Sequence, residues 1–377
     1  MVTKQVFEFR DMSNVRIFFA GDFCSKPSTS RINVSDELKS VIQSCDLKVV
    51  NFEVPLKPEV KLPSQKRERF YQNDDAPDFL RGLGFNLFSI ANNHAFDWGI
   101  EGFKKTKAVL GDAAFGAGTY EEAYRVKVVE VNGVKIGFLG LSFAAYTGVF
   151  EDVTKHNGLG CAYINDLRVN HDIIEAKKEV DFLFVLPHDG IEYIGIPTPE
   201  TIMRYRDFID YGADGVIAAH PHCPQGWEEY KGKPIFYSLG NFLFNSKDRY
   251  DFHCNKPHWY EGLCVIVQIE NSIIKWEVVN TRNVDNLGVE IDGHEDRNNY
   301  NEQLCRCLTN QEEYDRRIKK VIDKLGRVNE MKVIERSVLK HWFDRIRRKE
   351  FKKDDDELAY LIKNDQRRNL LIRAFGN

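Results

Sequence analysis

The chain has 377 residues, of which 42% are hydrophobic and 29% are charged, as in an ordinary soluble globular protein with one large domain or two smaller ones. Its formal net charge of −4 gives no indication of a nucleic-acid partner. None of the eight cysteines forms a CxxC pair, which argues against a zinc ribbon, and the chain is too long to depend on a disulfide scaffold. A reducing compartment is therefore expected.

The N-terminal stretch MVTKQVFEFRDMSN is polar and lacks the apolar core of a signal peptide. No run of eighteen apolar residues occurs anywhere in the sequence. We therefore expect a cytoplasmic protein without a transmembrane segment, either free or peripheral to a membrane complex.

The first half of the chain alternates strand-like and helix-like segments. VRIFFA and LKVVNF read as strands, and SDELKSVIQSC between them reads as an amphipathic helix capped by Ser35. APDFLRGLG is a second helix, NLFSIA a strand, and GIEGFKKTKAVLGD a third helix. RVKVVEVNGVKIGFLGLSF reads as a hairpin, because Asn132-Gly133 between two β-rich runs is a strong turn signal.

The second half resumes the same rhythm. INDLRVNHDIIEAKKEV and PETIMRYRDFIDYGA read as helices, and DFLFVLP, GVIAAH and KPIFYSLGNFLF as strands. GLCVIVQIENSIIKWEVVNT reads as a final hairpin. These segments predict an α/β fold in which two sheets pack face to face with helices outside.

The character of the chain changes in the segment GHEDRNNYNEQ, where we place a boundary near residues 295–305. Residues 301–377 are helical in period and hold 20 Lys and Arg against 14 Asp and Glu, whereas the rest of the chain holds 33 against 43. We predict a catalytic domain over residues 1–300 and a basic helical extension over 301–377. The extension is either a solvated helical surface or a docking surface for a protein or an anionic partner.

Polar residues that can bind a metal or move a proton follow five of the predicted strands. Since strand ends deliver side chains into one crevice in α/β proteins, these residues are expected to meet in one site. They are Asp22, Glu53, the Asn92-Asn93-His94 run, His188, and the pair His220 and His222. Oxygen and imidazole donors without clustered thiolates suit manganese, iron, zinc or a similar divalent ion.

The spacing of these residues suggests a role for each. His220 and His222 lie two apart, so in an extended chain both point the same way and can bind one centre. Glu53 is the candidate to bridge two cations, and Asp22, Asn93 and His188 are further ligands. His94 is the candidate general acid, oriented by Asp97.

Two groups of polar residues have less certain roles. Asn92 is a candidate on the substrate side, but the alternative for Asn92 and Asn93 is to cap the following helix. Arg67 and Arg69 are candidates to bind an anionic substrate, because the planar guanidinium suits phosphate and carboxylate groups. An exposed loop is the alternative for both arginines.

The ordered motifs GDF, NFE, ANNHAFDWG, PHDG, HPH and SLGNFLF resemble the CapA family of poly-γ-glutamate capsule biosynthesis proteins, a branch of the calcineurin-like metallophosphoesterases. The resemblance covers roughly residues 15–245. An extent to residue 285 is the alternative. The resemblance implies a four-layer αββα sandwich and a dinuclear metal centre.

Carried over by position, the resemblance implies a ligand set for two divalent metal ions, with manganese favoured over iron, zinc or magnesium. Asp22 and His222 would bind the first metal, Glu53 would bridge, and Asn93, His188 and His220 would bind the second. Ser238 and Asn241 of SLGNFLF would line or support the site.

This sequence departs from the family pattern at two positions. The wider superfamily has a histidine two residues after the first aspartate, where this chain has Cys24. His188 is followed by Asp189, where the family commonly has tryptophan. The first departure leaves the first metal with fewer protein ligands, and the second alters the pocket or orients His188.

The sequence leaves three functional hypotheses. The first is a metal-dependent hydrolase of phosphate mono- or diesters that acts on a polyanionic capsule or cell-envelope polymer, through a dinuclear centre that activates water. The second keeps the metal centre but acts on the amide bonds of a γ-glutamyl polymer. The third is a non-catalytic accessory subunit of a polymer-synthesis complex, docked through its C-terminal helices.

Overall fold

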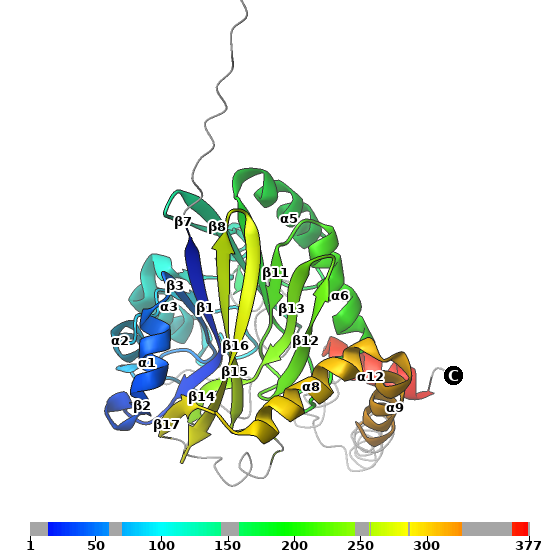
Figure 1. Ribbon diagram of the computed structural model, residues 1–377. Coiled ribbons are helices and arrows are strands. Elements are labelled where there is room, and N and C mark those ends of the chain that lie inside the picture. Colours follow the sequence, from blue (N-terminus) through cyan, green and yellow to red (C-terminus); the bar gives the residue numbers. More distant parts are fainter. Residues whose placement is uncertain are drawn as a thin grey trace, which may run out of the picture.

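Two β-sheets pack face to face at the centre of the molecule (Figure 1). The computed structural model describes residues 14–59, 70–144, 158–245, 256, 258–285, 287–325 and 364–375. Among these residues, the first sheet has nine strands, the second has six, and a small antiparallel pair lies apart from both.

The first sheet is built around β1, which pairs with β3 in parallel and with β15 antiparallel. Its strands in spatial order are β2 (Asn33–Val34), β17 (Gly288–Ile291), β16 (Ile273–Val284), β15 (Glu261–Glu270), β1 (Val15–Ser25), β3 (Leu47–Phe52), β4 (Leu87–Ser89) and β5 (Ala114–Phe115). A ninth strand, β14 (Asn241–Asn245), pairs in parallel with the end of β1.

The second sheet is built around parallel pairs of β10 with β8 and with β11. Its strands in spatial order are β12 (Pro224–Tyr230), β13 (Lys233–Leu239), β11 (Gly215–Ile217), β10 (Phe182–His188), β8 (Val134–Ser142) and β7 (Lys127–Val131). The small pair is β6 (Ala117–Thr119) with β9 (Leu159–Cys161).

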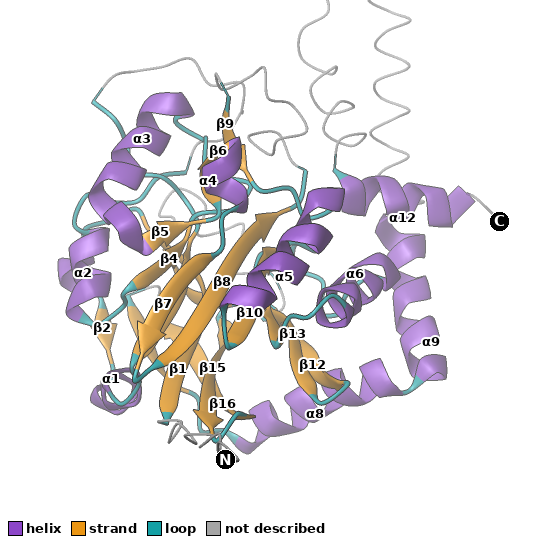
Figure 2. Cartoon of the chain, turned by 90° about the horizontal axis from the view of Figure 1, so that it is seen from above, coloured by secondary structure: helices purple, strands orange, loops and turns teal. Residues whose placement is uncertain are grey.

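Helices cover the outer faces of both sheets (Figure 2). The first sheet is flanked by α1 (Asp36–Gln43), α2 (Ala76–Gly82) and α3 (Gly99–Leu110), and the second by α4 (Tyr120–Tyr124), α5 (Leu167–Glu179) and α6 (Pro199–Asp210). The short 3₁₀ helices η1 (Thr29–Arg31) and η2 (Gly111–Ala113) complete this part of the chain. The predicted four-layer αββα sandwich is therefore confirmed.

The alternation of side chains along β1 explains why the layers assemble. Ile17 and Phe19 face the second sheet, where Phe19 lies 5.4 Å from Phe184 between ring centres. Phe18 and Ala20 face the opposite way, into the core beneath α1 to α3. Because successive residues of a strand point to opposite faces, one apolar strand contributes to two cores.

Two local predictions are confirmed. Ser35 caps α1 by accepting a hydrogen bond from the backbone N–H of Leu38. Asn132 and Gly133 join β7 to β8 with φ angles of 52° and 77°, the backbone of a tight hairpin turn.

KPIFYSLGNFLF is not the single strand that its apolar run predicts. The run divides at Gly240 into β13 of the second sheet and β14 of the first. Gly240 has a φ of 66°, and a Cβ on the neighbouring Gly21 would lie 2.0 Å from its carbonyl oxygen. The two glycines let the chain cross between the sheets beside the end of β1.

The C-terminal part of the described chain is helical and contacts the second sheet. Its helices are α8 (Glu295–Thr309), α9 (Gln311–Val321) and α12 (Asp365–Phe375). α8 lies along β12 and leads to α9, and α12 lies near α6 (Figure 1). α8 runs through the stretch where the sequence suggested a boundary, and whether residues 301–377 form a separate domain stays a prediction.

Candidate metal centre

The predicted strand-end residues come together where the parallel strands of the two sheets end. Asp22 lies in β1, Glu53 follows β3, and the Asn92-Asn93-His94 run follows β4. His188 ends β10, and its backbone forms a bridge with Ala219, just before His220. β1, β3 and β4 run parallel in the first sheet, as do β10 and β11 in the second. The facing sheets therefore supply donors from both sides of one crevice.

The two carboxylates are completely buried and belong to overlapping donor groups. Glu53, His188 and His220 each offer a ligand atom within 4.8 Å of the others, and so do Asp22, Glu53 and His222. Asp22 and Glu53 both have 0% exposed surface. Because Glu53 belongs to both groups, it occupies the position from which one carboxylate can bridge two cations.

The imidazoles lie close to one another and to Asn93. His188 Nε2 lies 3.1 Å from His220 Nδ1 and 2.8 Å from the amide oxygen of Asn93. His222 Nδ1 lies 3.3 Å from Asp22 Oδ2, and its Nε2 lies 3.5 Å from Glu53 Oε1. Two carboxylates, three imidazoles and an amide oxygen form a donor set that suits a pair of divalent ions.

The two buried carboxylates act strongly on the His222 imidazole. Burial by itself lowers the pKa of His222, but the carboxylates of Glu53 and Asp22 outweigh burial and raise this pKa to about 10. A potential that stabilises an imidazolium also attracts a metal cation. The donor set and its buried carboxylates therefore fit a metal centre.

The backbone around the histidine pair adopts an uncommon conformation. His220 has a φ of 106° and His222 a φ of 55°, values that non-glycine residues rarely adopt. The backbone N–H of His220 donates to Asp22 Oδ2 over 3.1 Å, and Gly190 leaves room for the ring of Pro221. A strained backbone is typical of functional sites, because the interactions of the surrounding fold offset the free-energy cost of the strain.

His94 and Asp97 form a hydrogen-bonded pair beside the carboxylates. His94 Nδ1 lies 2.8 Å from Asp97 Oδ2, and its Nε2 lies 3.8 Å from Glu53 Oε1. The backbone N–H of Phe70 also donates to Asp97, and the Phe70 ring packs edge-on against His94 at 5.1 Å. The imidazole is therefore held with Nδ1 at Asp97 and Nε2 toward Glu53, and its role as a general acid stays a prediction.

The residues predicted on the substrate side have supporting contacts. Asn92 donates to the Phe52 carbonyl and accepts from the backbone N–H of His94, so it braces the turn. α3 begins at Gly99, so neither Asn92 nor Asn93 caps that helix. Ser238 donates to the Cys223 carbonyl over 2.8 Å. Arg67 and Arg69 lie outside the described residues.

Asn241 contacts the candidate ligand His222 directly, and it does so from β14. Its Oδ1 lies 2.9 Å from His222 Nδ1, and its Nδ2 donates to the Trp259 carbonyl. Trp259 and Phe244 pack on the His222 ring with centroid distances of 5.1 and 4.8 Å. The crossing of the chain at Gly240 is what brings Asn241 to this position.

Asn51 is a site residue that the sequence analysis missed. Its Nδ2 donates to Asp22 Oδ1 over 2.7 Å and lies 3.1 Å from His188 Nδ1, so it links a carboxylate of one sheet to an imidazole of the other. A signal was present, since Asn51 interrupts an apolar strand two residues before Glu53 and shares its face.

Cys24 lies in the wall of the site and outside both donor groups. It is fully buried against Val54, Phe244 and Trp259. Burial, with the Glu53 carboxylate adding to it, raises the pKa of the Cys24 thiol well above its ordinary value. Cys24 therefore contributes apolar packing at the position where the wider superfamily has a histidine.

Asp189, the second departure from the family pattern, is buried immediately after His188. Burial raises the pKa of Asp189 to about 6, and a hydrogen bond from Gln366 opposes that rise. Gln366 lies in α12, so a residue near the C-terminus contacts the neighbour of a candidate ligand.

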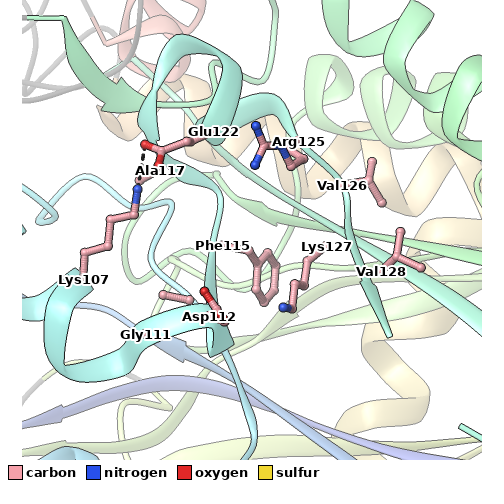
Figure 3. A pocket seen from close by; sticks show the side chains of 11 residues that line it. Lys107, Gly111, Asp112, Phe115, Ala117, Glu122, Arg125, Val126, Lys127 and Val128 are labelled. Atoms are coloured by element: carbon pink, nitrogen blue, oxygen red, sulfur yellow. Dashed lines mark ion pairs between the residues drawn. The ribbon is translucent and has the colours of Figure 1, made fainter. Parts of the chain in front are cut away.

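A separate cavity of about 300 Å³ lies away from these residues (Figure 3). Arg125, Lys127 and Phe115 line it, and an ion pair between Lys107 and Glu122 with a separation of 2.7 Å lies at its edge. None of the predicted site residues lines this cavity. The chemistry of the buried side chains, rather than the size of a cavity, identifies the candidate centre.

The two facing sheets with helices outside form an αββα sandwich, and carboxylates and histidines converge in a candidate metal site at its strand ends. Residues 16–246 match the family described as bacterial capsule synthesis protein PGA_cap, and the chain belongs to that family.

Two curated relatives and one solved structure illustrate the similarity. The chain is 31% identical over 214 residues to the PGA biosynthesis protein CapA of Bacillus subtilis, covering 55% of this chain and 56% of the relative. It is 26% identical over 210 residues to a probable polyglutamine synthesis accessory protein of Mycobacterium tuberculosis, covering 52% and 55%. A structure described as a novel phosphatase from Mycoplasma pneumoniae aligns with a TM-score of 0.43 and 16% identity, covering 71% of this chain and 94% of that one.

The matches have a limited extent. The chain spans about half the length of the curated relatives it matches. Among the described residues, no helix has the length and apolar character needed to cross a membrane.

Proposed function

We propose that this protein is a metal-dependent hydrolase of phosphate mono- or diesters in the metabolism of a capsule or cell-envelope polymer. The observation that carries the proposal is the pair of buried donor groups that share Glu53, with the His94–Asp97 pair directly beside them. Asp22 and His222 would hold one ion, Asn93, His188 and His220 the other, and Glu53 both. Two divalent ions bound here, with manganese favoured, would lower the pKa of water and polarise the phosphoryl group.

The residues of the chain supply the remaining steps. Water attacks phosphorus and releases a proton to solvent, and the bond from phosphorus to the leaving oxygen breaks. His94 donates the proton on Nε2 to that oxygen, and Asp97 stabilises the imidazolium beforehand through its contact with Nδ1. Trp259 and Phe244 restrict the access of bulk water from the side of His222.

Two lysines pack on aromatic rings that connect through Phe70 to His94, and they favour an anionic substrate. Lys26 Nζ lies 5.0 Å from the centre of the Tyr71 ring, and Lys57 Nζ lies 5.2 Å from the Tyr71 and Trp98 rings. Trp98 donates to the carbonyl of Phe70, whose own ring packs on His94. Burial, together with the like charge of Lys57, lowers the pKa of Lys26. An anionic group of the substrate would relieve this repulsion.

The decisive test combines metal content with hydrolysis of aryl phosphate mono- and diesters under added Mn²⁺. Wild type should bind about two metals per chain and be active. His220→Ala should lose both properties, while His171→Ala, which changes an exposed histidine on α5, should retain them. Wild-type protein that contains metal but hydrolyses neither ester would contradict the phosphoesterase proposal.

An amide-bond hydrolase or transferase for γ-glutamyl polymers is the second candidate. The description of the Bacillus subtilis relative as a PGA biosynthesis protein favours it, since a polyglutamate backbone consists of amide bonds. The same metal centre can polarise an amide carbonyl. Product analysis on γ-glutamyl peptides and phosphate esters separates the two candidates.

A non-catalytic accessory subunit is the third candidate. This candidate is favoured because the Mycobacterium tuberculosis relative is described as a probable accessory protein of polyglutamine synthesis. Purified wild-type protein that binds no metal would support this candidate and contradict both enzymatic ones.

A further inference from the structure

Gln366 of α12 lies in a buried polar network next to the metal centre. Its amide nitrogen donates to both carboxylate oxygens of Asp189, each over 3.0 Å. The same nitrogen lies 3.1 Å from Thr201 Oγ1, and its amide oxygen accepts from Thr198 Oγ1 over 2.9 Å. These four residues are at most 5% exposed. Both the nitrogen and the oxygen of the Gln366 amide are therefore hydrogen-bonded. Because the network is buried, the loss of one partner would destabilise the folded state.

The network is covalently linked to the candidate ligand His188 through Asp189. Asp189 directly follows His188, and its backbone N–H donates to the Ala219 carbonyl, just before His220. The His188 carbonyl accepts from the backbone N–H of Phe143. The Asp189 carboxylate is therefore attached to the same short backbone segment that carries the His188 imidazole and lies beside Ala219.

α12 is anchored on both sides of this network. Asp365 accepts from Tyr163 Oη over 2.5 Å and from Asn165 Nδ2 over 3.1 Å. Leu370 is 2% exposed, and Arg373 forms an ion pair with Glu200 with a separation of 2.7 Å. These contacts hold Gln366 in place, because they fix α12 to Tyr163 and Asn165 on one side and to Glu200 on the other.

We propose that Gln366 is a positioning residue of the metal centre: by fixing the Asp189 carboxylate, it fixes the His188 imidazole that would bind metal. This inference rests on the metal centre of the proposed function, and it assigns a role to a segment outside the matched residues 16–246. A buried carboxylate without its donor would turn or draw in water, since an unpaired charge is costly in a protein interior.

The test measures metal binding by the full-length protein and does not depend on catalysis. Gln366→Met keeps the length and helix propensity of the side chain but removes both hydrogen-bonding ends. It should weaken Mn²⁺ binding about tenfold in chelator competition and change the visible absorption of the Co²⁺-loaded protein. Asp189→Asn keeps an acceptor for Gln366 and should bind Mn²⁺ more tightly than Gln366→Met.

Arg373→Ala is the matched control, because it removes an exposed ion pair from the same helix. It should leave Mn²⁺ affinity and the Co²⁺ spectrum unchanged. Gln366→Glu is a second variant, which keeps an acceptor for Thr198 but places a carboxylate against Asp189; it should weaken Mn²⁺ binding at least as much as Gln366→Met.

Three outcomes would overturn the proposal. The first is wild-type Mn²⁺ affinity and an unchanged Co²⁺ spectrum in either folded Gln366 variant. The second is an equal loss of affinity in Arg373→Ala, and the third is that both Gln366 variants fail to fold while Arg373→Ala folds. A wild type that binds metal without hydrolysing phosphate esters would overturn the phosphoesterase proposal but leave this comparison valid.

Discussion

Individual side chains at the candidate centre have separable roles. Asn93, His188 and His220 are candidate ligands, whereas His94 contacts Asp97 on one ring nitrogen and faces Glu53 with the other. Asn51 makes no contact that requires a metal, yet it joins Asp22 to His188. Some substitutions should therefore abolish metal binding, whereas others should keep the metal and lower only kcat.

His94→Gln tests the proton donor. If His94 protonates the leaving group, this variant should keep about two metals per chain, while kcat for an aryl phosphate falls by about 10²–10⁴-fold. Metal analysis and steady-state kinetics on the same preparation measure both properties. A kcat within about threefold of wild type, far short of the loss expected for a general acid, would rule out that role.

Lys57→Met tests the preference for an anionic substrate. The variant should raise KM for a polyanionic phosphoester about tenfold and reduce the salt dependence of kcat/KM, because one screened charge contact is lost. Kinetics with a small aryl phosphate should change little. Lys104→Met, at an exposed position of α3, is the matched control. Equal effects of the two substitutions would argue against a specific role for Lys57.

At the scale of single elements, helix caps and turn residues fix where a helix or strand begins and ends. The hairpin of β7 and β8 is an example, because Gly133 requires a left-handed backbone and has open space around its Cα. Its φ of 77° alone makes a side chain unfavourable there.

Gly133→Ala should therefore destabilise the protein by about 1 kcal/mol, since a Cβ disfavours the left-handed conformation. Gly82→Ala, in α2 with nothing within 4 Å of the added Cβ, should be neutral or stabilising. Thermal unfolding of the two variants beside wild type measures the difference. A lower Tm for Gly82→Ala than for Gly133→Ala would contradict the argument.

At the scale of the whole molecule, the C-terminal helices share a core with the sandwich. Tyr314 and Ile318 of α9 pack with Ile196, and the Tyr314 hydroxyl donates to the Pro197 carbonyl over 3.0 Å. Leu304 of α8 closely approaches Gly226 of β12. These contacts argue against a freely detachable extension.

Deleting residues 301–377 should expose this apolar surface and lower the Tm by about 5 °C or more. Catalysis should fall with it, because the truncation also removes Gln366. A second truncation that retains α8 and α9 separates the two effects: it should recover most of the Tm but not the metal affinity. If the protein without residues 301–377 keeps full activity and loses only the binding of a partner, the extension would be a docking module.

Many of the candidate site residues can be read from the amino-acid sequence alone. Apolar runs that end in polar residues located Asp22, Glu53, His188, His220 and His222, because a buried strand is short and its end is marked by composition. The Ser35 cap and the Asn132-Gly133 turn were also readable, since both depend on contacts within a few residues.

Features that depend on contacts between distant parts of the chain become visible only in the folded protein. KPIFYSLGNFLF reads as one strand, and only the close approach of Gly21 to Gly240 shows that it divides between two sheets. Gln366 carries no local signal, because its contact with Asp189 joins residues 177 positions apart. Local chemistry fixes elements and their ends, whereas packing between distant segments decides which side chains share a site.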